Sequence, residues 1–354
     1  MTPRERVLRC LNHQTADRVP LNGTFKEEVW EKLKVHFETE DTEEILEAFG
    51  IDFRGVGMDP SPAFRERARQ VTAIGLAIPY EDGSYETEWG VRQRVGGHSP
   101  YMQYVYCPLA DERNLDTYTF PDLDEPGRFE SAKERLPRLK ERYVVSAGTS
   151  TFFRHGWDLR GLENWLMDIV EESPFMLKLL DRLLEFKLEQ IRRFAEMGVD
   201  IISVGGDITM HTGPFMPPEL WRKHFKRRDA LLVEEAKSYG VQHFFFHSDG
   251  NLMPLMEDLI EIGFTIFDPI QPECMDPVEV KARFGDQITL HGTISAQQTL
   301  PFGTVEDVRN EVLNRIERCG RNGGLVIAPN NVVQYDVPLE NLRAVYETVK
   351  TAGK

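Results

Sequence analysis

The segment Val241-Gln242-His243-Phe244-Phe245-Phe246-His247-Ser248-Asp249-Gly250-Asn251 contains an apolar, aromatic run that gives way to polar residues and a glycine. A short apolar run that ends in a turn signal indicates a buried β-strand. His247 and Asp249 are two residues apart, so on an extended chain their side chains point to the same side. The segment therefore predicts a strand that presents an imidazole and a carboxylate together at its C-terminal end.

Seven further segments show the same pattern, and helix-like segments fill most of the intervals between them. Alternating strands and helices favour a parallel sheet, and eight such units are typical of a (β/α)8 barrel of the α/β class. The predicted strands are residues 18–25, 52–58, 143–149, 199–207, 241–247, 264–270, 288–293 and 324–329. Because barrel active sites are built at the C-terminal ends of the strands, the pattern also predicts an enzyme.

Residues 72–109 break this rhythm, because short alternating runs are separated there by Glu-Asp-Gly-Ser and Gly-Gly turns. We interpret them as a β-hairpin insertion after strand 2. At 354 residues the chain exceeds a bare barrel by about one insertion, so we expect a single domain over residues 1–354. An edge of the hairpin can pair with a second subunit, giving a homodimer, or cover the barrel mouth as a lid.

Composition narrows the class of function. A formal charge of −16 argues against wide contact with nucleic acid or anionic membranes, so a small-molecule substrate fits better. The N-terminus lacks the apolar core of a signal peptide, and no stretch approaches the roughly 20 apolar residues of a membrane span, so we expect a cytoplasmic protein. Its four cysteines are widely separated, which favours reduced thiols over a disulfide framework.

Three polar residues after predicted strands 4 and 5 are candidates for catalysis. Asp207 follows Gly205-Gly206 and is suited to proton chemistry. His247 and Asp249 can converge on one ligand, and Gly250 allows a sharp turn after them. In the structural alternative, Asp249 caps the next helix and His247 only forms a hydrogen bond inside the barrel.

Glu273 and Cys274 follow predicted strand 6. A thiolate and a carboxylate can bind Zn²⁺ with a neutral imidazole, which gives His247, Glu273 and Cys274 as a candidate metal set. Glu273 is also a candidate catalytic base. The alternatives are that Cys274 is a small buried hydrophobe and that Glu273 caps the helix beginning at Pro277.

Other candidates bind substrate. His291 ends predicted strand 7, although a structural histidine explains it equally well. Asn330 and Asn331 follow strand 8, where their amides can orient a substrate, but asparagine also suits turns. Arg154 and His155 follow strand 3 in a cationic and aromatic stretch that suits an anionic or aromatic substrate, unless the arginine pairs with a neighbouring carboxylate.

Several motifs resemble the uroporphyrinogen decarboxylase superfamily, which includes the decarboxylase and cobalamin- or coenzyme M-linked methyltransferases. The resemblance covers nearly the whole chain and is strongest in the C-terminal third. The motifs are Thr2-Pro3-Arg4-Glu5-Arg6-Val7, Asp17-Arg18-Val19-Pro20, Leu159-Arg160-Gly161, His247-x-Asp249-Gly250, Gln271-Pro272-Glu273, His291-Gly292-Thr293-Ile294, Leu300-Pro301-x-Gly303-Thr304 and Pro338-Leu339-Glu340-Asn341.

Two departures from the family pattern bear on the reaction. The decarboxylases carry an Arg-Gln-Ala-Gly-Arg segment near the N-terminus that holds substrate carboxylates, whereas residues 19–25 here contain no arginine. The methyltransferases hold Zn²⁺ through a His-x-Cys pair and a later cysteine. Here His247 is retained and Asp249 replaces the cysteine of the pair. The position of the family's later cysteine corresponds to Asn330 or Asn331, so this ligand is also replaced.

The resemblance thus implies a corrinoid-linked methyltransferase of the demethylase type, acting on a small molecule with a methyl-corrinoid protein as partner and Zn²⁺ as a Lewis acid. In this mechanism His247 binds metal or substrate, Asp249 and Glu273 act as ligand or base, and Asp207, Arg154 and Asn331 position the substrate. One alternative is a cofactor-free decarboxylase. Another is a non-catalytic subunit that presents a small molecule to a corrinoid partner.

Overall fold

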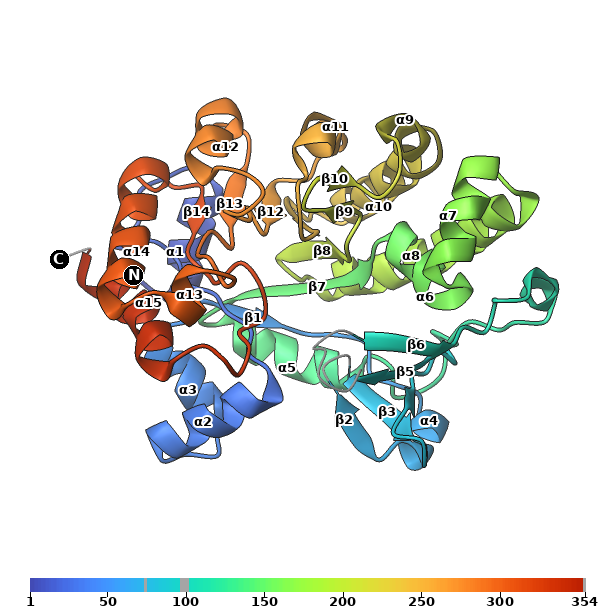
Figure 1. The fold of residues 1–354 in the computed structure, drawn as a ribbon. Coiled ribbons are helices and arrows are strands. Elements are labelled where there is room, and N and C mark those ends of the chain that lie inside the picture. The colour runs from blue at the N-terminus through green and yellow to red at the C-terminus, as the bar shows by residue number, and fades with distance from the viewer. Residues whose placement is uncertain (73–74, 96–101, 353–354) are drawn as a thin grey trace.

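The computed structural model describes residues 1–72, 75–95 and 102–352, and its main feature is a curved parallel sheet (Figure 1). Within the described residues seven strands form this sheet, in the order β1-β7-β8-β11-β12-β13-β14. The strands are β1 (Phe53–Gly55), β7 (Val144–Ser150), β8 (Ile201–Gly205), β11 (His243–His247), β12 (Ile266–Asp268), β13 (Thr289–His291) and β14 (Leu325–Val326). Every neighbouring pair is parallel, so the C-terminal ends of all seven meet on one side.

Residues 18–25, predicted as the first strand, close the ring between β14 and β1. Leu21 forms a parallel bridge with Ile327, and the Asp52 N–H donates to the Leu21 carbonyl oxygen at 2.9 Å. The segment is not a regular strand because Pro20 has no N–H and the Leu21 N–H donates to the Asp52 carboxylate at 2.9 Å. The (β/α)8 barrel is confirmed, with its first strand reduced to isolated bridges.

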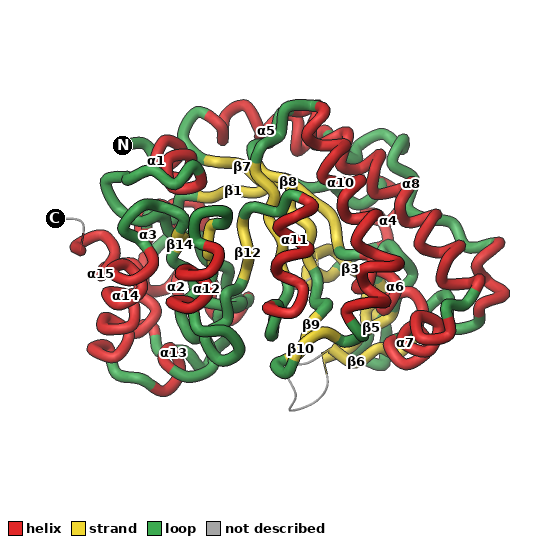
Figure 2. The backbone as a smooth tube through the Cα atoms, turned by 90° about the horizontal axis from the view of Figure 1, so that it is seen from above, coloured by secondary structure: helices red, strands yellow, loops and turns green. Residues whose placement is uncertain are grey.

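Helices surround these strands (Figure 2). They include α1 (Pro3–Leu11), α2 (Glu27–Phe37), α3 (Thr42–Phe49), α5 (Glu130–Lys140), α8 (Pro174–Met197), α10 (Arg227–Ser238), α11 (Met256–Ile262), α12 (Pro277–Phe284), α14 (Val305–Cys319) and α15 (Leu339–Ala352). The further helical segments are α4 (Pro62–Arg67), α6 (Phe152–Arg160), α7 (Leu162–Glu171), α9 (Pro218–Trp221), α13 (Thr299–Phe302), η1 (Glu112–Asp116), η2 (Arg222–Lys226) and η3 (Met253–Leu255). No helix in the described part of the chain is long and apolar enough to span a bilayer.

Helix α1 closes the N-terminal end of the barrel. It starts at a capping box in which Thr2 accepts from the Glu5 N–H and Glu5 accepts from the Thr2 N–H. Its apolar face packs against the first residues of several strands, and all of these side chains are buried. This cluster contains Val7, Cys10, Leu11, Phe53, Val144, Ile201, Ile266 and Val326. The opposite, C-terminal end is therefore the end at which a site can be built.

The insertion predicted at about residues 72–109 is confirmed as a β insertion after β1, but it has more strands than one hairpin. Residues 70–106 contain a five-stranded antiparallel sheet beside the barrel (Figure 1). Its strands are β2 (Gln70–Thr72), β3 (Gly75–Pro79), β4 (Tyr85–Glu86), β5 (Arg92–Val95) and β6 (Met102–Tyr106). Tight turns connect β3 to β4 and β4 to β5. In the turn between β3 and β4, the Asp82 carboxylate accepts from the Ser84 N–H at 3.0 Å.

Gly148 leaves no room for a side chain between β7 and β8. A Cβ at this position in β7 would lie 1.9 Å from the carbonyl oxygen of Ser203 in β8. Because both atoms belong to sheet backbones, we expect Gly148→Ala to lower the free energy of unfolding by at least ~1–3 kcal/mol. Gly55→Ala on β1 is the control, since the nearest atom to its Cβ is 3.8 Å away. Urea unfolding of the two variants measures the difference, and equal stabilities would refute the prediction.

Candidate active site

The C-terminal ends of four barrel strands bring polar side chains together at the mouth of the barrel. Asp207 follows β8, His247 ends β11, Asp268 ends β12 and His291 ends β13. Asp249 lies two residues beyond β11, on the turn predicted from the sequence. The turn requires Gly250, which has φ +94°, and a Cβ there would lie 2.4 Å from the Met210 carbonyl oxygen.

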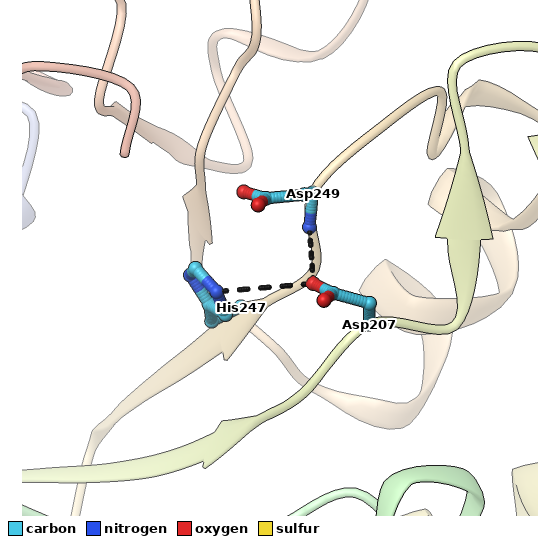
Figure 3. A group of neighbouring side chains, drawn as sticks. All are labelled: Asp207, His247 and Asp249. Atoms are coloured by element: carbon cyan, nitrogen blue, oxygen red, sulfur yellow. Dashed lines mark hydrogen bonds and ion pairs between the residues drawn. The ribbon is translucent and has the colours of Figure 1, made fainter. Parts of the chain in front are cut away.

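Asp207, His247 and Asp249 form the centre of this group (Figure 3). One ligand atom from each lies within 4.8 Å of the other two. The Asp249 N–H donates to Asp207 Oδ1 at 2.9 Å, and the same oxygen lies 4.0 Å from His247 Nε2. All three residues are only partly buried, so a small molecule or ion can reach them from the mouth.

Asp268 was not among the residues singled out from the sequence, yet it contacts two histidines of the site. His247 Nδ1 donates to Asp268 Oδ2 at 2.6 Å, and His291 Nδ1 donates to Asp268 Oδ1. His247 therefore turns its Nε2 atom toward Asp207. The sequence feature that could have identified Asp268 is its place as the last residue of a barrel strand. In the structure it is the register partner of His247 on the neighbouring strand.

Burial and neighbouring charges shift the pKa values of His247, Asp249 and Asp268. Burial lowers the pKa of His247, but the hydrogen bond to Asp268 and the charges of Asp268, Asp249 and Asp207 outweigh it and raise the value to about 9. Burial and the charge of Asp207 raise the pKa of Asp249 to about 7, although His247 lowers it. Burial also raises the pKa of Asp268, but the two histidines hold it well below its usual range.

The donor set of this group fits a divalent metal ion. A partly exposed imidazole with its Nδ1 bound to a carboxylate is the usual form of a histidine ligand. Asp249 Oδ2 accepts from Asn331 Nδ2 at 2.5 Å, whereas the buried Asp249 Oδ1 has no hydrogen-bond partner among the residues that the structure describes. Two carboxylates and one imidazole suit Zn²⁺ with an open position, and also harder ions such as Mn²⁺.

The structure does not bring the predicted metal set of His247, Glu273 and Cys274 together. Among the described residues, the group of Asp207, His247 and Asp249 is the one in which three metal-binding side chains lie within 4.8 Å of one another. Glu273 is instead held at Oε1 by the Ser295 hydroxyl and at Oε2 by Asn330 Nδ2, the latter at 2.7 Å.

Cys274 is also poorly suited to metal binding. Burial and the charges of Glu273 and Asp249 raise the pKa of its thiol to about 11, which disfavours the thiolate that a metal requires. Half-buried Cys274 packs against the hydrophobic core, as its structural alternative predicted.

The structural alternatives for two carboxylates are wrong. Asp249 does not cap the helix after β11: η3 begins after Leu252 without a side-chain cap, and Asn251 Oδ1 accepts from the Met253 N–H at 3.1 Å. Helix α12 is capped by Asp276, whose Oδ1 accepts from the Val278 N–H at 2.9 Å, rather than by Glu273. Neither Asp249 nor Glu273 is therefore a helix cap.

The two predicted asparagines have different surroundings. Asn331 lies at the mouth, bound to Asp249. Asn330 is buried, and its Oδ1 accepts from the Ala296 N–H at 2.9 Å while its amide donates to Glu273. Asn330 and Glu273 therefore tie the loops after β14, β12 and β13 to one another.

Arg154 lies next to the group, and His155 does not. The side chain of Arg154 packs on Gly206, where a Cβ would lie 2.7 Å from Arg154 Cβ. Its Nε donates to Asp158 at 2.9 Å, the pairing that the sequence offered as an alternative, and its Nη2 donates to Tyr104 of the inserted sheet at 3.0 Å. Because Arg154 is about one quarter exposed, it can still meet a substrate.

His155 is buried behind this layer. Its Nδ1 lies 2.7 Å from the ammonium nitrogen of Lys187, and its ring packs against Trp89 of the insertion. Burial and the charge of Lys187 lower the pKa of His155 well below its usual value, so the ring is neutral. This environment is that of a core histidine rather than a substrate ligand.

Comparisons with known proteins agree with the barrel. The family model of uroporphyrinogen decarboxylase matches residues 147–352, more than half of the chain. A search of curated proteins found no match. Among solved structures, a methyltransferase from Methanosarcina mazei superposes with a TM-score of 0.71 at 17% identity, covering 100% of both chains. At this identity the likeness shows a shared fold.

A second solved structure is less similar. The B12-independent methionine synthase from Shewanella sp. W3-18-1 has a TM-score of 0.48 at 12% identity, covering 96% of this chain and 97% of its own. That likeness carries no argument about the reaction. The family match over strands β7 to β14, where Asp207, His247 and Asp249 lie, is the finding that assigns the chain. The protein belongs to the uroporphyrinogen decarboxylase family.

Proposed function

We propose that this protein is a methyltransferase that takes a methyl group from a small molecule and passes it to a corrinoid, with a divalent metal ion such as Zn²⁺ held by Asp207, His247 and Asp249. The observation that carries the proposal is the set of three ligand atoms within 4.8 Å of one another, with His247 Nε2 facing the carboxylates. When bound, such an ion supplies a Lewis acid that stabilises negative charge on the leaving atom.

The chain's own residues have separate roles in this proposal. Asn331 holds Asp249 by one oxygen and leaves the other available. Asp268 fixes the His247 ring. Arg154, beside Asp207, positions an anionic group of the substrate. Glu273 acts through Asn330 and Ser295, as a support for the loops rather than as a base.

The proposed transfer balances without a further oxidant. The bond between the methyl carbon and its heteroatom breaks, and the electron pair stays on the heteroatom, which then takes a proton from water. The Co(I) centre of the corrinoid supplies the electron pair of the new cobalt–carbon bond. The difficult bond chemistry belongs to the corrinoid, and the protein contributes binding, orientation and charge.

The same proposal includes the setting of the enzyme. We place it in the cytoplasm as one domain over residues 1–354, with a corrinoid protein as its partner. The inserted sheet β2–β6 lies next to Arg154 through Tyr104, so it is the part of the chain best placed to cover a bound substrate or to contact a second subunit.

Two measurements on the purified native protein test the proposal. We expect elemental analysis to find about one Zn²⁺ or similar ion per chain, lost after dialysis against a chelator and regained on adding the metal. We expect the loaded protein to convert cob(I)alamin to methylcobalamin, followed by visible absorption, with at least one methoxylated or methylated small molecule. Loss of the metal should abolish that conversion.

The alternatives give different results. A protein that binds no metal even after Zn²⁺ is added would remove the Lewis acid, and the paired titrations of His247 and Asp249 would then favour a cofactor-free decarboxylase. A metal-binding protein whose reconstituted system turns over equally well without His247 would instead be a presenting subunit. Residues 19–25 argue against the decarboxylase, because they contain no arginine to hold carboxylates.

A further inference from the structure

The side chains behind His247 form a continuous chain across four barrel segments. Asp268 accepts from His247 Nδ1 at 2.6 Å and from His291 Nδ1. On its other side, His291 Nε2 lies 3.0 Å from Asn22 Nδ2, on the segment that closes the barrel. The chain therefore runs Asn22, His291, Asp268, His247, from the first segment of the barrel to the candidate metal group.

The far end of this chain fixes the tautomer of His291. Asn22 Oδ1 accepts from the Gly23 N–H at 2.9 Å, so the Asn22 amide nitrogen faces His291 and donates to its Nε2. An Nε2 atom that accepts a hydrogen bond leaves the ring proton on Nδ1. His291 must then donate to Asp268 Oδ1. That oxygen is occupied, so Oδ2 is the oxygen left for His247.

Packing around Asp268 and His291 restricts the rotation of both side chains. A Cβ on Gly292 would lie 2.6 Å from Asp268 Oδ1, so the backbone after β13 encloses this oxygen. The rings of Phe53 and Phe245 meet His291 edge to face at 6.0 and 5.2 Å between centroids. His291 is buried and Asp268 is nearly so, with 15% of its side chain exposed.

We infer that Asp268, locked by His291 and Asn22, is the positioning residue that makes His247 present Nε2 to a metal ion. This inference rests on the proposed function for the metal, but the hydrogen bonds themselves do not. A carboxylate behind a ligand histidine fixes the ring orientation and raises the ligand's basicity, and its loss costs about 10–100-fold in metal affinity. His291, predicted from the sequence to bind substrate, thereby acts on the far side of Asp268.

The first test measures Zn²⁺ affinity by competition with a chromophoric chelator. We expect Asp268→Asn, which keeps the shape of the side chain, to bind Zn²⁺ about 10–100-fold more weakly than the native protein. Asp268→Glu keeps a carboxylate and should recover part of that loss. The control is Asp286→Asn, an exposed residue before β13, which should bind as the native protein does. Melting temperatures establish that all variants are folded.

The second test needs no metal. In the metal-free protein labelled with ¹⁵N-histidine, the Nδ1 protons of His247 and His291 should resonate far downfield of the backbone amides, and both signals should be lost in Asp268→Asn. In Asn22→Ala only the ring of His291 should gain the other tautomer. Two native downfield signals that vanish together support the inference. Their absence from the native spectrum, or equal Zn²⁺ affinity in folded Asp268→Asn, overturns it.

The two proposals fail separately. A native protein that binds no metal contradicts the proposed function, and the NMR measurement still decides the role of Asp268. A native protein that binds metal, with Asp268→Asn binding it equally well, contradicts the inference and leaves the proposed function standing.

Discussion

His247→Ala is expected to abolish metal binding and methyl transfer together. In the proposed metal site His247 supplies the imidazole and Asp207 and Asp249 supply carboxylates, so the substitution removes one of three candidate ligand atoms. Losing a residue behind a ligand already costs about 10–100-fold in affinity, and we expect removal of the ligand itself to cost more than ~100-fold. Chelator competition measures the affinity, and formation of methylcobalamin measures the transfer.

Two control variants separate this expectation from its rivals. His36→Ala removes an exposed histidine of α2 and should leave metal content unchanged. Cys274→Ala should also keep the metal, because the structure leaves Cys274 outside the group of Asp207, His247 and Asp249. Loss of the metal in Cys274→Ala would favour the thiolate set predicted from the sequence over the carboxylate set.

Asp52→Ala is expected to lower the free energy of unfolding by ~3–5 kcal/mol, the cost of leaving buried charges without their partner. Asp52 is fully buried. It accepts from Arg6 Nη1 at 2.6 Å and from Arg18 Nη1 at 2.9 Å. Its Oδ2 also accepts the Leu21 N–H, so the same residue holds the segment that closes the barrel. Urea unfolding followed by circular dichroism measures the loss.

An exposed ion pair provides the matched comparison. Arg343 and Glu347 pair on the surface of α15 at 2.8 Å, with about half of each side chain exposed. Glu347→Ala should change the stability by no more than ~0.5 kcal/mol, because water already solvates both charges. Similar losses in Asp52→Ala and Glu347→Ala would show that burial of the Asp52 network is not what makes it important.

The barrel could be predicted from the sequence because its signal is repeated. Buried parallel strands are short apolar runs, and each ends in polar residues, as at His247 and Asp207. The first strand was the exception. Its pairing depends on the carboxylate of Asp52, which accepts the Leu21 N–H in place of a backbone carbonyl. Asp52 is 31 positions from Leu21, so no local sequence pattern predicts this contact.

The grouping of side chains in the candidate site could be predicted only in part. Position at a strand end identified Asp207, His247 and Asp249, which the structure brings within 4.8 Å of one another. The pattern could not show that the Glu273 side chain points toward Asn330. Glu273 follows a strand as Asp207 and Asp249 do, and the direction of a side chain after a strand is not encoded in that pattern. Asp268 was overlooked since its importance comes from two histidines on neighbouring strands, 21 and 23 residues away.

Helix α1 closes the N-terminal end of the barrel, which constrains the order of steps in the proposed catalytic cycle. In the part of the chain that the structure describes, Val7 and Cys10 are buried against the strands at one end of the barrel, and 35% of the His247 side chain is exposed at the other. In the proposed methyl transfer, the donor and the acceptor therefore reach the site from the same end of the barrel, one after the other. If the acceptor in the proposed reaction is a protein that docks at this end, we expect the demethylated product to leave only after that protein has dissociated.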